Sequence, residues 1–368
     1  MNKQKIKMKA KYLMIATVAT LLAACSNDEN EMNNGPVEAR VTAGMGVETR
    51  AVNDNPSSFA ANDAIGVIVT KVEQIVEGGT SGAATSGMVA RYKNVKYTTE
   101  QGGSPATFAA GTGAGIFFQD ATETVTFAAY YPYQTTTNAG TLPGTDGSGI
   151  IAVDTKDNNK VTANENKQAK IDFLFASGAT ASKSSPTVEF KDNSSTTNGT
   201  NCQFQHKMAQ LKLVIVGSTQ DGFTEEEAKK VCDGNSTYKL GGLKHTGTFT
   251  LAVVDGTATG TAKVSDDAQA VTDWTITGCA RTYDVDNYKC TYTLILLPQD
   301  CSGSGSALAF KATIGGQEYT NNSSIAPNLE AGKTYTYTIT VKKTGLTVSG
   351  CTIGAWTTTT DQTGDATM

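Results

Sequence analysis

The chain has 368 residues, a formal net charge of −5 and only 18% charged side chains. This balance argues against nucleic acid or an anionic membrane surface as a partner. Valine, threonine and tyrosine recur in alternating runs, and there are 37 glycines but only 8 prolines, which indicates an all-β protein with long polar loops. The length suggests two domains.

The first 24 residues predict the export signal of a lipoprotein. Lysines stand at every second position from 3 to 11, and an apolar stretch covers 12–24, ending in small residues before Cys25. This order is typical of a secretory signal, and the stretch is shorter than the roughly 20 residues of a membrane-spanning helix. Because the thiol of a cysteine placed there can take a diacylglycerol, we expect Cys25 to be the lipidated N-terminus. A plain secretory signal with an incidental cysteine is the alternative.

An acidic tether, 25–36, leads to the clearest strand pattern in the chain. Apolar residues recur at every second position from 37 to 47, which predicts a strand buried on one face. The strand ends before Arg50, and a polar, turn-rich stretch begins at Ala51. A lone arginine in an exposed loop is well placed for a trypsin-like protease. The apolar positions are Val37, Ala39, Val41, Ala43, Met45 and Val47.

The rest of the chain predicts strands separated by polar loops, with at most one or two short helices. A polar linker at 192–201 favours two tandem β-sandwich domains, 37–195 and 196–368. A capping box at Thr224 predicts a short helix through Val231, and the strand expected at 204–216 changes phase near Ala209, which suggests a bulge. Other strands are expected at 65–70, 90–97, 125–131, 149–153, 171–176, 247–254, 274–277, 291–297, 308–314, 335–341 and 346–356.

Cysteines and histidines give few signs of a chemical site. Six cysteines follow Cys25, and an even number in an exported chain permits disulfides, with buried free thiols as the alternative. Without a CxxC pair, and with only two histidines, no zinc site is expected. His206 alternates with apolar residues and is expected in the core, whereas His245, near glycine turns, is expected to be exposed. The six cysteines are Cys202, Cys232, Cys279, Cys290, Cys301 and Cys351.

We find no signature of catalysis. The sequence has no GxSxG elbow, no HExxH motif, no phosphate loop and no carboxylate pair whose spacing favours glycosidic chemistry, so we expect no enzyme, metal or cofactor. The run 157–159 could bind calcium, but a solvated loop is the simpler interpretation. Tyr130, Tyr131 and Tyr133 could form a sugar platform, but a rim of the core is the simpler interpretation.

Short segments along nearly the whole chain follow one another in a characteristic order. After Cys25 and its acidic tether come 49–51 (TRA), 62–67 (NDAIGV), 127–133 (FAAYYPY), 204–209 (FQHKMA), 329–335 (LEAGKTY) and 353–356 (IGAW). Together they resemble the fimbrillin family, the lipoprotein pilins of type V pili in Gram-negative anaerobes. The six later cysteines depart from the family pattern. So does the absence of a tryptophan a few residues before Asn62, where this sequence has Phe59 instead.

The resemblance implies two transthyretin-like β-sandwich domains and export to the outer membrane surface. It implies a structural or adhesive subunit of a pilus (fimbrium), with other pilin subunits as partners in a homo- or heteropolymer. An arginine-specific protease would cut between Arg50 and Ala51 and remove residues 37–50. Arg40 is a poorer site because it lies inside the strand.

Physical reasoning agrees with that implication. Removing an apolar strand from a sandwich exposes a groove with unpaired backbone groups, which a strand of the next subunit can fill by donor-strand exchange. The donor is expected in the C-terminal segment, at Leu346, Val348, Ile353 and Trp356. The alternative is a monomeric surface-anchored lipoprotein that binds glycan or host protein, with an intact Arg50 and exposed tyrosines at 130, 131 and 133. Shaft, tip and anchor roles all remain open.

Overall fold

The computed structural model describes seven stretches of the chain. In them, none of the helices combines the length and the hydropathy that crossing a bilayer requires. Residues 37–368 belong to the larger of the two units into which the chain divides. Cys25, Val47, Arg50 and Ala51 lie outside the described residues, which are 35–45, 58–74, 82–83, 87–135, 149–162, 165–196 and 199–356.

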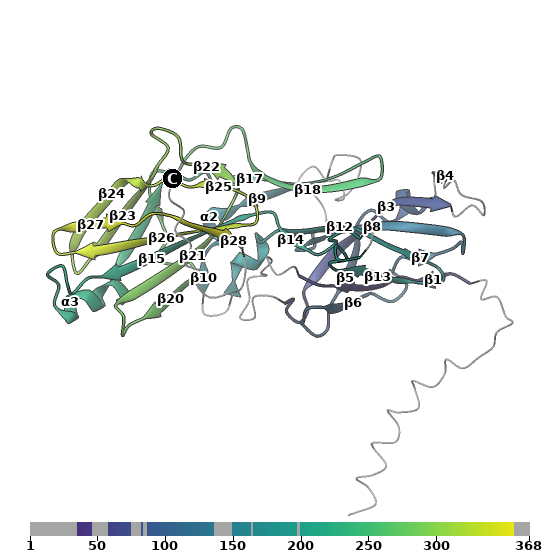
Figure 1. The fold of residues 1–368 in the computed structure, drawn as a ribbon, viewed down its shortest axis with the longest axis horizontal. Coiled ribbons are helices and arrows are strands. Elements are labelled where there is room, and N and C mark those ends of the chain that lie inside the picture. Colours follow the sequence, from purple (N-terminus) through teal and green to yellow (C-terminus); the bar gives the residue numbers. More distant parts are fainter. Residues whose placement is uncertain are drawn as a thin grey trace, which may run out of the picture. The chain divides into compact units, whose positions relative to one another are not determined.

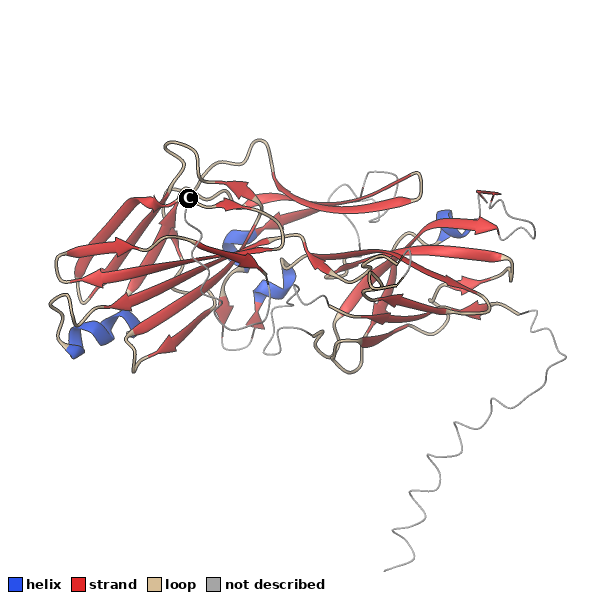
Figure 2. Ribbon diagram, viewed as in Figure 1, coloured by secondary structure: helices blue, strands red, loops and turns tan. Residues whose placement is uncertain are grey.

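The first half of the larger unit folds around one hydrophobic core (Figures 1 and 2). Its main strands are β2 (Arg40–Ala43), β3 (Ala64–Gln74), β4 (Gly82–Ala83), β5 (Val95–Thr98), β6 (Ala106–Ala110), β8 (Glu123–Tyr131), β12 (Leu174–Ser182), β13 (Thr187–Phe190) and β14 (Gln205–His206). They follow the order β13-β2-β6-β5-β3-β8-β12-β14, with β4 beside β3. Only two residue pairs join β5 to β6, and the sheet turns there so that both parts face the same core.

Two smaller elements complete this half. The strand β1 (Val37–Glu38) pairs with β7 (Phe117–Phe118), and a short helix, α1 (Gly87–Arg91), buries Met88 against the core.

The second half surrounds a second core with two larger sheets. Its strands are β15 (Ala209–Gly217), β16 (Thr237–Gly241), β19 (Trp274–Thr275), β20 (Arg281–Asp284), β21 (Lys289–Leu296), β22 (Gln299–Asp300), β23 (Leu308–Ile314), β24 (Gln317–Ile325), β25 (Asn328–Leu329), β26 (Lys333–Lys342), β27 (Gly345–Val348) and β28 (Thr352–Ala355). One sheet has the order β20-β21-β15-β26-β27, with β28 also on β26, and the other has the order β19-β16-β23-β24.

The helix expected after Thr224 is present as α3 (Glu225–Lys229), continued by the 3-10 turn η2 (Lys230–Cys232). The Thr224 hydroxyl accepts a hydrogen bond from the Glu227 backbone N–H at 3.2 Å, and the Glu227 carboxylate accepts one from the Thr224 N–H at 2.8 Å. Both halves of the capping box that the sequence predicts are therefore formed.

One segment of the first half joins the second half instead of the first sheet. The strand β9 (Gly149–Asp154) pairs with β17 (Thr246–Val254), which pairs in turn with β18 (Thr257–Val264). The elements α2 (Thr155–Asn158), β10 (Val161–Thr162), β11 (Glu165–Asn166) and η1 (Lys167–Lys170) follow β9. A third apolar cluster draws residues from both halves, so the serial division into 37–195 and 196–368 stays a prediction.

Buried amides fix this crossing segment, 149–171, to the second half. The Asn159 side chain donates to the Ile295 carbonyl and accepts from the Ile295 N–H, both at 2.7 Å. The Gln168 side chain donates to the Thr293 carbonyl at 2.8 Å. Asn159 is thus fully buried, and Asp157 forms an ion pair with Lys160. The solvated-loop interpretation of 157–159 is therefore wrong for Asn159, and the described residues hold no cluster of metal-ligating side chains.

The strand expected at 204–216 is two strands in different sheets, so the bulge interpretation is wrong. The strand β14 pairs with β12, whereas β15 pairs with β21 and β26. Between them Met208 is fully buried in the third cluster. The change of phase therefore marks the passage from one sheet to another. The strand expected at 90–97 is also shorter, because residues 87–91 form α1.

The six later cysteines are all free thiols. Four of them are buried, as the second of the two possibilities left open by the sequence requires, whereas Cys232 and Cys351 are half-buried. Burial raises the pKa of Cys279 and of Cys290 to about 12, so these thiols behave as small apolar side chains. The expectation that His245 is exposed is wrong, because only 3% of its surface is accessible. It packs edge-on against Trp274, and its Nδ1 lies 2.9 Å from the Thr155 hydroxyl.

Two of the short segments singled out in the sequence, 62–67 and 127–133, meet in the core of the first half. Tyr131 donates its hydroxyl hydrogen to the Asp63 carboxylate at 3.1 Å, and burial raises the pKa of Asp63. Tyr130 lies directly over Gly66, where a methyl group would overlap the Tyr130 ring, and its hydroxyl contacts Asn94. The glycine is therefore required by the close approach of the tyrosine ring.

Replacing His245 with glutamine should flatten the dependence of stability on pH. Burial lowers the pKa of His245 from 6.5 to about 4, so the unfolded chain binds more protons between these values and stability rises with pH across that window. The difference is about 3 kcal/mol between pH 4 and pH 7. Urea unfolding at a series of pH values measures it, and identical pH profiles for the two proteins would contradict the assignment.

Replacing Gly66 with alanine should destabilise the fold by about 1–3 kcal/mol, because the added methyl group displaces the Tyr130 ring. Gly354→Ala is the matched control, since Gly354 also lies in a strand and nothing approaches the position of its missing side chain. Urea unfolding of both variants tests this, and equal free energies of unfolding would show that the ring moves aside without cost.

Candidate functional site

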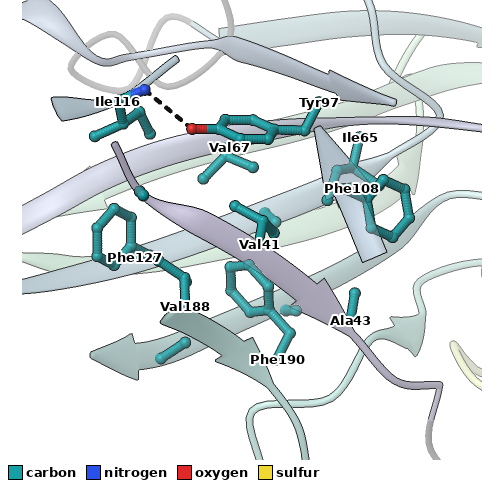
Figure 3. Packing of buried hydrophobic residues seen from close by; sticks show 14 of the residues in the cluster. Val41, Ala43, Ile65, Val67, Tyr97, Phe108, Ile116, Phe127, Val188 and Phe190 are labelled. Atoms are coloured by element: carbon teal, nitrogen blue, oxygen red, sulfur yellow. Dashed lines mark hydrogen bonds between the residues drawn. The ribbon is translucent and has the colours of Figure 1, made fainter. Parts of the chain in front are cut away.

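The strand expected at the start of the mature chain lies between two other strands of the first half. In register, Val41 faces Phe108 of β6 and Val188 of β13. The pairing is antiparallel to β6 and parallel to β13, and Figure 3 shows β2 passing among the core side chains. In the described residues β6 and β13 pair with β2 and not with each other. The strand therefore fills a slot one strand wide.

Main-chain hydrogen bonds extend beyond the four residues of β2. The Ala39 N–H donates to the Ile116 carbonyl, and the Gly44 N–H donates to the Phe190 carbonyl, both at 2.8 Å. The Met45 N–H donates to the Ser104 hydroxyl at 3.1 Å. Strand-like contacts thus run from residue 37 to residue 45, where the described stretch ends.

Alternate side chains of this segment enter the core. Val41 is fully buried, and Ala39, Ala43 and Met45 are also buried, with at most 6% of their surface accessible. Between them, Arg40 is exposed. The core that receives them is built from side chains of both parts of the sheet, including Ile65, Val67, Tyr97, Phe108, Phe127, Val188 and Phe190 (Figure 3).

Tyr97 closes the core at the start of the segment. Its hydroxyl accepts a hydrogen bond from the Ile116 N–H at 3.0 Å (Figure 3), and the Ile116 carbonyl in turn accepts from Ala39. Burial raises the pKa of Tyr97 to about 12, so the phenol stays neutral at physiological pH. The first segment is thereby tied to Ile116, just before β7, through a continuous chain of hydrogen bonds.

Both walls of the slot remain attached to the fold without β2. The wall formed by β6 continues into β5 by hydrogen bonding. The wall formed by β13 follows β12 after a short turn in which Ser182 and Ser185 exchange backbone hydrogen bonds at 3.1 Å. Loss of the first segment would therefore open a groove between β6 and β13 and leave β13 without a paired strand among the described residues, held to the fold through β12.

The expected donor segment lies against β26 of its own chain. Both β27 and β28 pair with β26 in antiparallel fashion, at the edge of the sheet. Leu346 and Val348 are half-buried, and Ile353 is 53% exposed. Trp356, by contrast, is fully buried in the third cluster. The segment is thus weakly covered along most of its length and firmly held at its end.

The end of this segment is held by a stacked ring pair. The rings of Trp356 and His206 are parallel within 2°, with centroids 3.8 Å apart, and the backbone N–H of Trp356 donates to the Gly332 carbonyl at 2.9 Å. His206 Nδ1 lies 2.6 Å from the Asp172 carboxylate, and both side chains are fully buried. Burial raises the pKa of Asp172. The core position expected for His206 is therefore confirmed, and it brings together segments 204–209, 329–335 and 353–356.

The tyrosines proposed as a sugar platform do not form one. Tyr130 is fully buried and Tyr131 is 4% exposed, while Tyr133 is half-buried. The phenol groups of the first two are hydrogen-bonded inside the protein. The rim-of-core interpretation is therefore the right one for Tyr130 and Tyr131, and the glycan-binding alternative loses the surface on which it was based.

Comparison with known proteins places the chain in a family. A candidate fimbrium subunit, Fim1C of Bacteroides uniformis, is 28% identical over 351 residues, which cover 93% of this chain and 94% of that protein. Two solved structures of candidate cell adhesion proteins, from Bacteroides ovatus and Bacteroides uniformis, are each 23% identical and match 89% of this chain and 100% of theirs, with TM-scores of 0.60 and 0.51. At that identity they show the shared all-β fold. The fimbrillin-like family model matches residues 49–356, and the chain therefore belongs to the fimbrillin-like family.

Proposed function

We propose that the protein is a structural subunit of a surface pilus that polymerises by donor-strand exchange. In this proposal the chain is exported as a lipoprotein on Cys25 and held at the outer membrane. An arginine-specific protease then cuts between Arg50 and Ala51 and releases the first strand. The C-terminal segment of another pilin subunit fills the vacated slot. Membership of the family and the relative described as a fimbrium subunit support this role.

The position of β2 is the observation that carries the proposal. The strand bonds to β6 on one side and to β13 on the other, so its removal leaves two facing rows of unpaired N–H and C=O groups. Such groups are costly unless another strand pairs with them. A peptide that adds main-chain hydrogen bonds and alternate side chains gains both affinity and a fixed register. Contacts of this kind, repeated head to tail without closing, build a filament.

The size of the side chains that the first segment buries sets how strongly this segment is held in its slot, and a donor strand has to match that strength. Val41 and Met45 each stabilise the folded state by about 1.5–3 kcal/mol through burial, and the two alanines contribute less. The first segment is therefore held as much by its main-chain hydrogen bonds as by its side chains. A cut near residue 50 would leave it attached only by these non-covalent contacts, which favours exchange with another strand.

Arg50→Ala should leave the protein folded and block assembly, because the first strand then stays covalently bound in its slot. Arg40→Ala is the matched control: Arg40 lies inside β2 and its side chain is exposed, so that variant should be cut and polymerise normally. N-terminal sequencing of surface material detects the cut, and SDS-resistant ladders on a gel detect polymerisation. Normal filaments from Arg50→Ala, with no cut at another residue, would exclude the mechanism. An intact acylated Cys25 in all wild-type material would favour an anchor subunit of the pilus or the monomeric lipoprotein.

Ile353→Asp should abolish elongation while leaving the stability of the subunit unchanged. The side chain of Ile353 is 53% exposed on its own chain, but as a donor residue it would enter the apolar slot of a neighbour, where an unpaired charge is costly. Thr352→Asp, next to it and also exposed, is the matched control and should still polymerise. Truncation after Lys343 is a poorer test, because it also removes the buried Trp356. Filament length by electron microscopy gives the result, and wild-type filaments from Ile353→Asp would rule out this residue as a donor.

A further inference from the structure

A polar cleft lies between the edge of the first sheet and β18. Its volume is about 360 Å³, which is within the size range of small-ligand sites. Its polar side chains come from β12, β14, β18 and the residues just before and just after β14, and eleven residues line it in all. The polar lining that matters here is Lys207, Gln205, Gln203, Asn201, Ser177 and Thr261.

Lys207 is the one charged residue of this lining. The side chain is half-buried, and its ammonium group lies 5.7 Å from the centroid of the Phe175 ring. No carboxylate among the residues that the structure describes forms an ion pair with it, and burial lowers the pKa of Lys207. A partly desolvated cation without a counter-charge is unfavourable by itself. It is therefore a ready partner for an anion.

The face of Phe175 is already covered. A methyl group on Gly260 of β18 would lie 2.6 Å from the Phe175 ring, so β18 packs directly on it. The ring is thus a floor beneath Lys207 rather than a stacking surface for a ligand. Binding in the cleft would depend on the ammonium group and on hydrogen bonds.

The remaining polar groups are amides and hydroxyls. Asn201, Gln203 and Gln205 can both donate and accept hydrogen bonds, as can Ser177 and Thr261. The side-chain amide of Gln203 also donates to the Met45 carbonyl at 3.4 Å, and the rest of this amide can form hydrogen bonds in the cleft. Such paired donor and acceptor groups match the hydroxyls of a sugar, whereas the single cation matches a carboxylate or a sulfate.

We propose that the cleft at Lys207 binds an acidic saccharide, with the carboxylate or sulfate of the sugar on the Lys207 ammonium group and the sugar hydroxyls on the surrounding amides. This goes beyond assembly of the pilus, because the cleft lies outside the slot filled by β2. It would give each subunit along a filament its own adhesive site.

Titration calorimetry with the purified protein at low salt tests the proposal. The probes are glucuronate, N-acetylneuraminate and glucose 6-sulfate, with glucose as the neutral analogue and acetate as the bare anion. We expect at least one acidic sugar to bind at least about tenfold more tightly than glucose and than acetate. The affinity should fall as salt is added, because the charge on Lys207 is not fully buried.

Three variants separate a binding role of Lys207 from a structural one. Lys207→Gln should weaken the binding of the acidic sugar at least about tenfold. Its midpoint of thermal unfolding should be unchanged or higher, because an unpaired cation is removed. Lys263→Gln removes the same charge from an exposed position on β18 outside the lining and should bind as the wild type does. Gln205→Leu should weaken the binding of the sugar while Lys207 stays in place. This variant provides the test if Lys207→Gln fails to fold.

Three results would overturn the proposal. The first is that none of the acidic sugars binds. The second is that acetate binds as tightly as they do, which would make the cleft a plain anion site. The third is that the Lys207→Gln and Lys263→Gln variants lose affinity equally, which would mean that only the net charge matters. None of these results depends on whether filaments form.

Discussion

The main-chain hydrogen bonding of β2 to both of its neighbours is the interaction on which the first half depends. The strand is short, and half of its buried side chains are alanine, yet it connects β6 to β13 and completes the wall over the core. Among the described residues β13 pairs with no other strand, so its place in the sheet depends on β2. In the proposed function, the place of this segment is taken by a peptide with the same alternation of apolar residues.

Local pattern predicted many of the strands, because alternation depends only on which face of a strand is buried. It worked best where large residues alternate with threonine, as in β26. It failed for β18, whose buried positions are Ala258, Gly260 and Ala262. Those residues are small because rings or backbone from another strand press on them, as Phe175 does on Gly260. The residue that requires a small side chain lies on another strand, so the sequence around the small residue does not indicate it.

The candidate site was predictable in part for the same reason. The period of two from residue 37 identified a strand with one buried face, but it could not say that β6 and β13 would be its two partners. The motif segments were recognisable one by one, whereas the contacts that explain them, Tyr130 over Gly66 and Trp356 on His206, join positions 64 and 150 residues apart. Lys207 went unnoticed because a single lysine beside a core histidine has no distinguishing pattern.

The crossing segment 149–171 has a mechanical consequence. The chain passes between the two halves three times, from β8 to β9, from η1 to β12 and from β14 to β15. The segment between the first and the second passage is anchored to the second half by the pairing of β9 with β17 and by the hydrogen bonds of Asn159 with Ile295. A pull along the chain therefore cannot simply straighten one connecting loop. It has to shear a paired strand and break the buried hydrogen bonds of side-chain amides at the same moment. The force needed for extension would therefore be well above that of two domains joined by a single flexible linker.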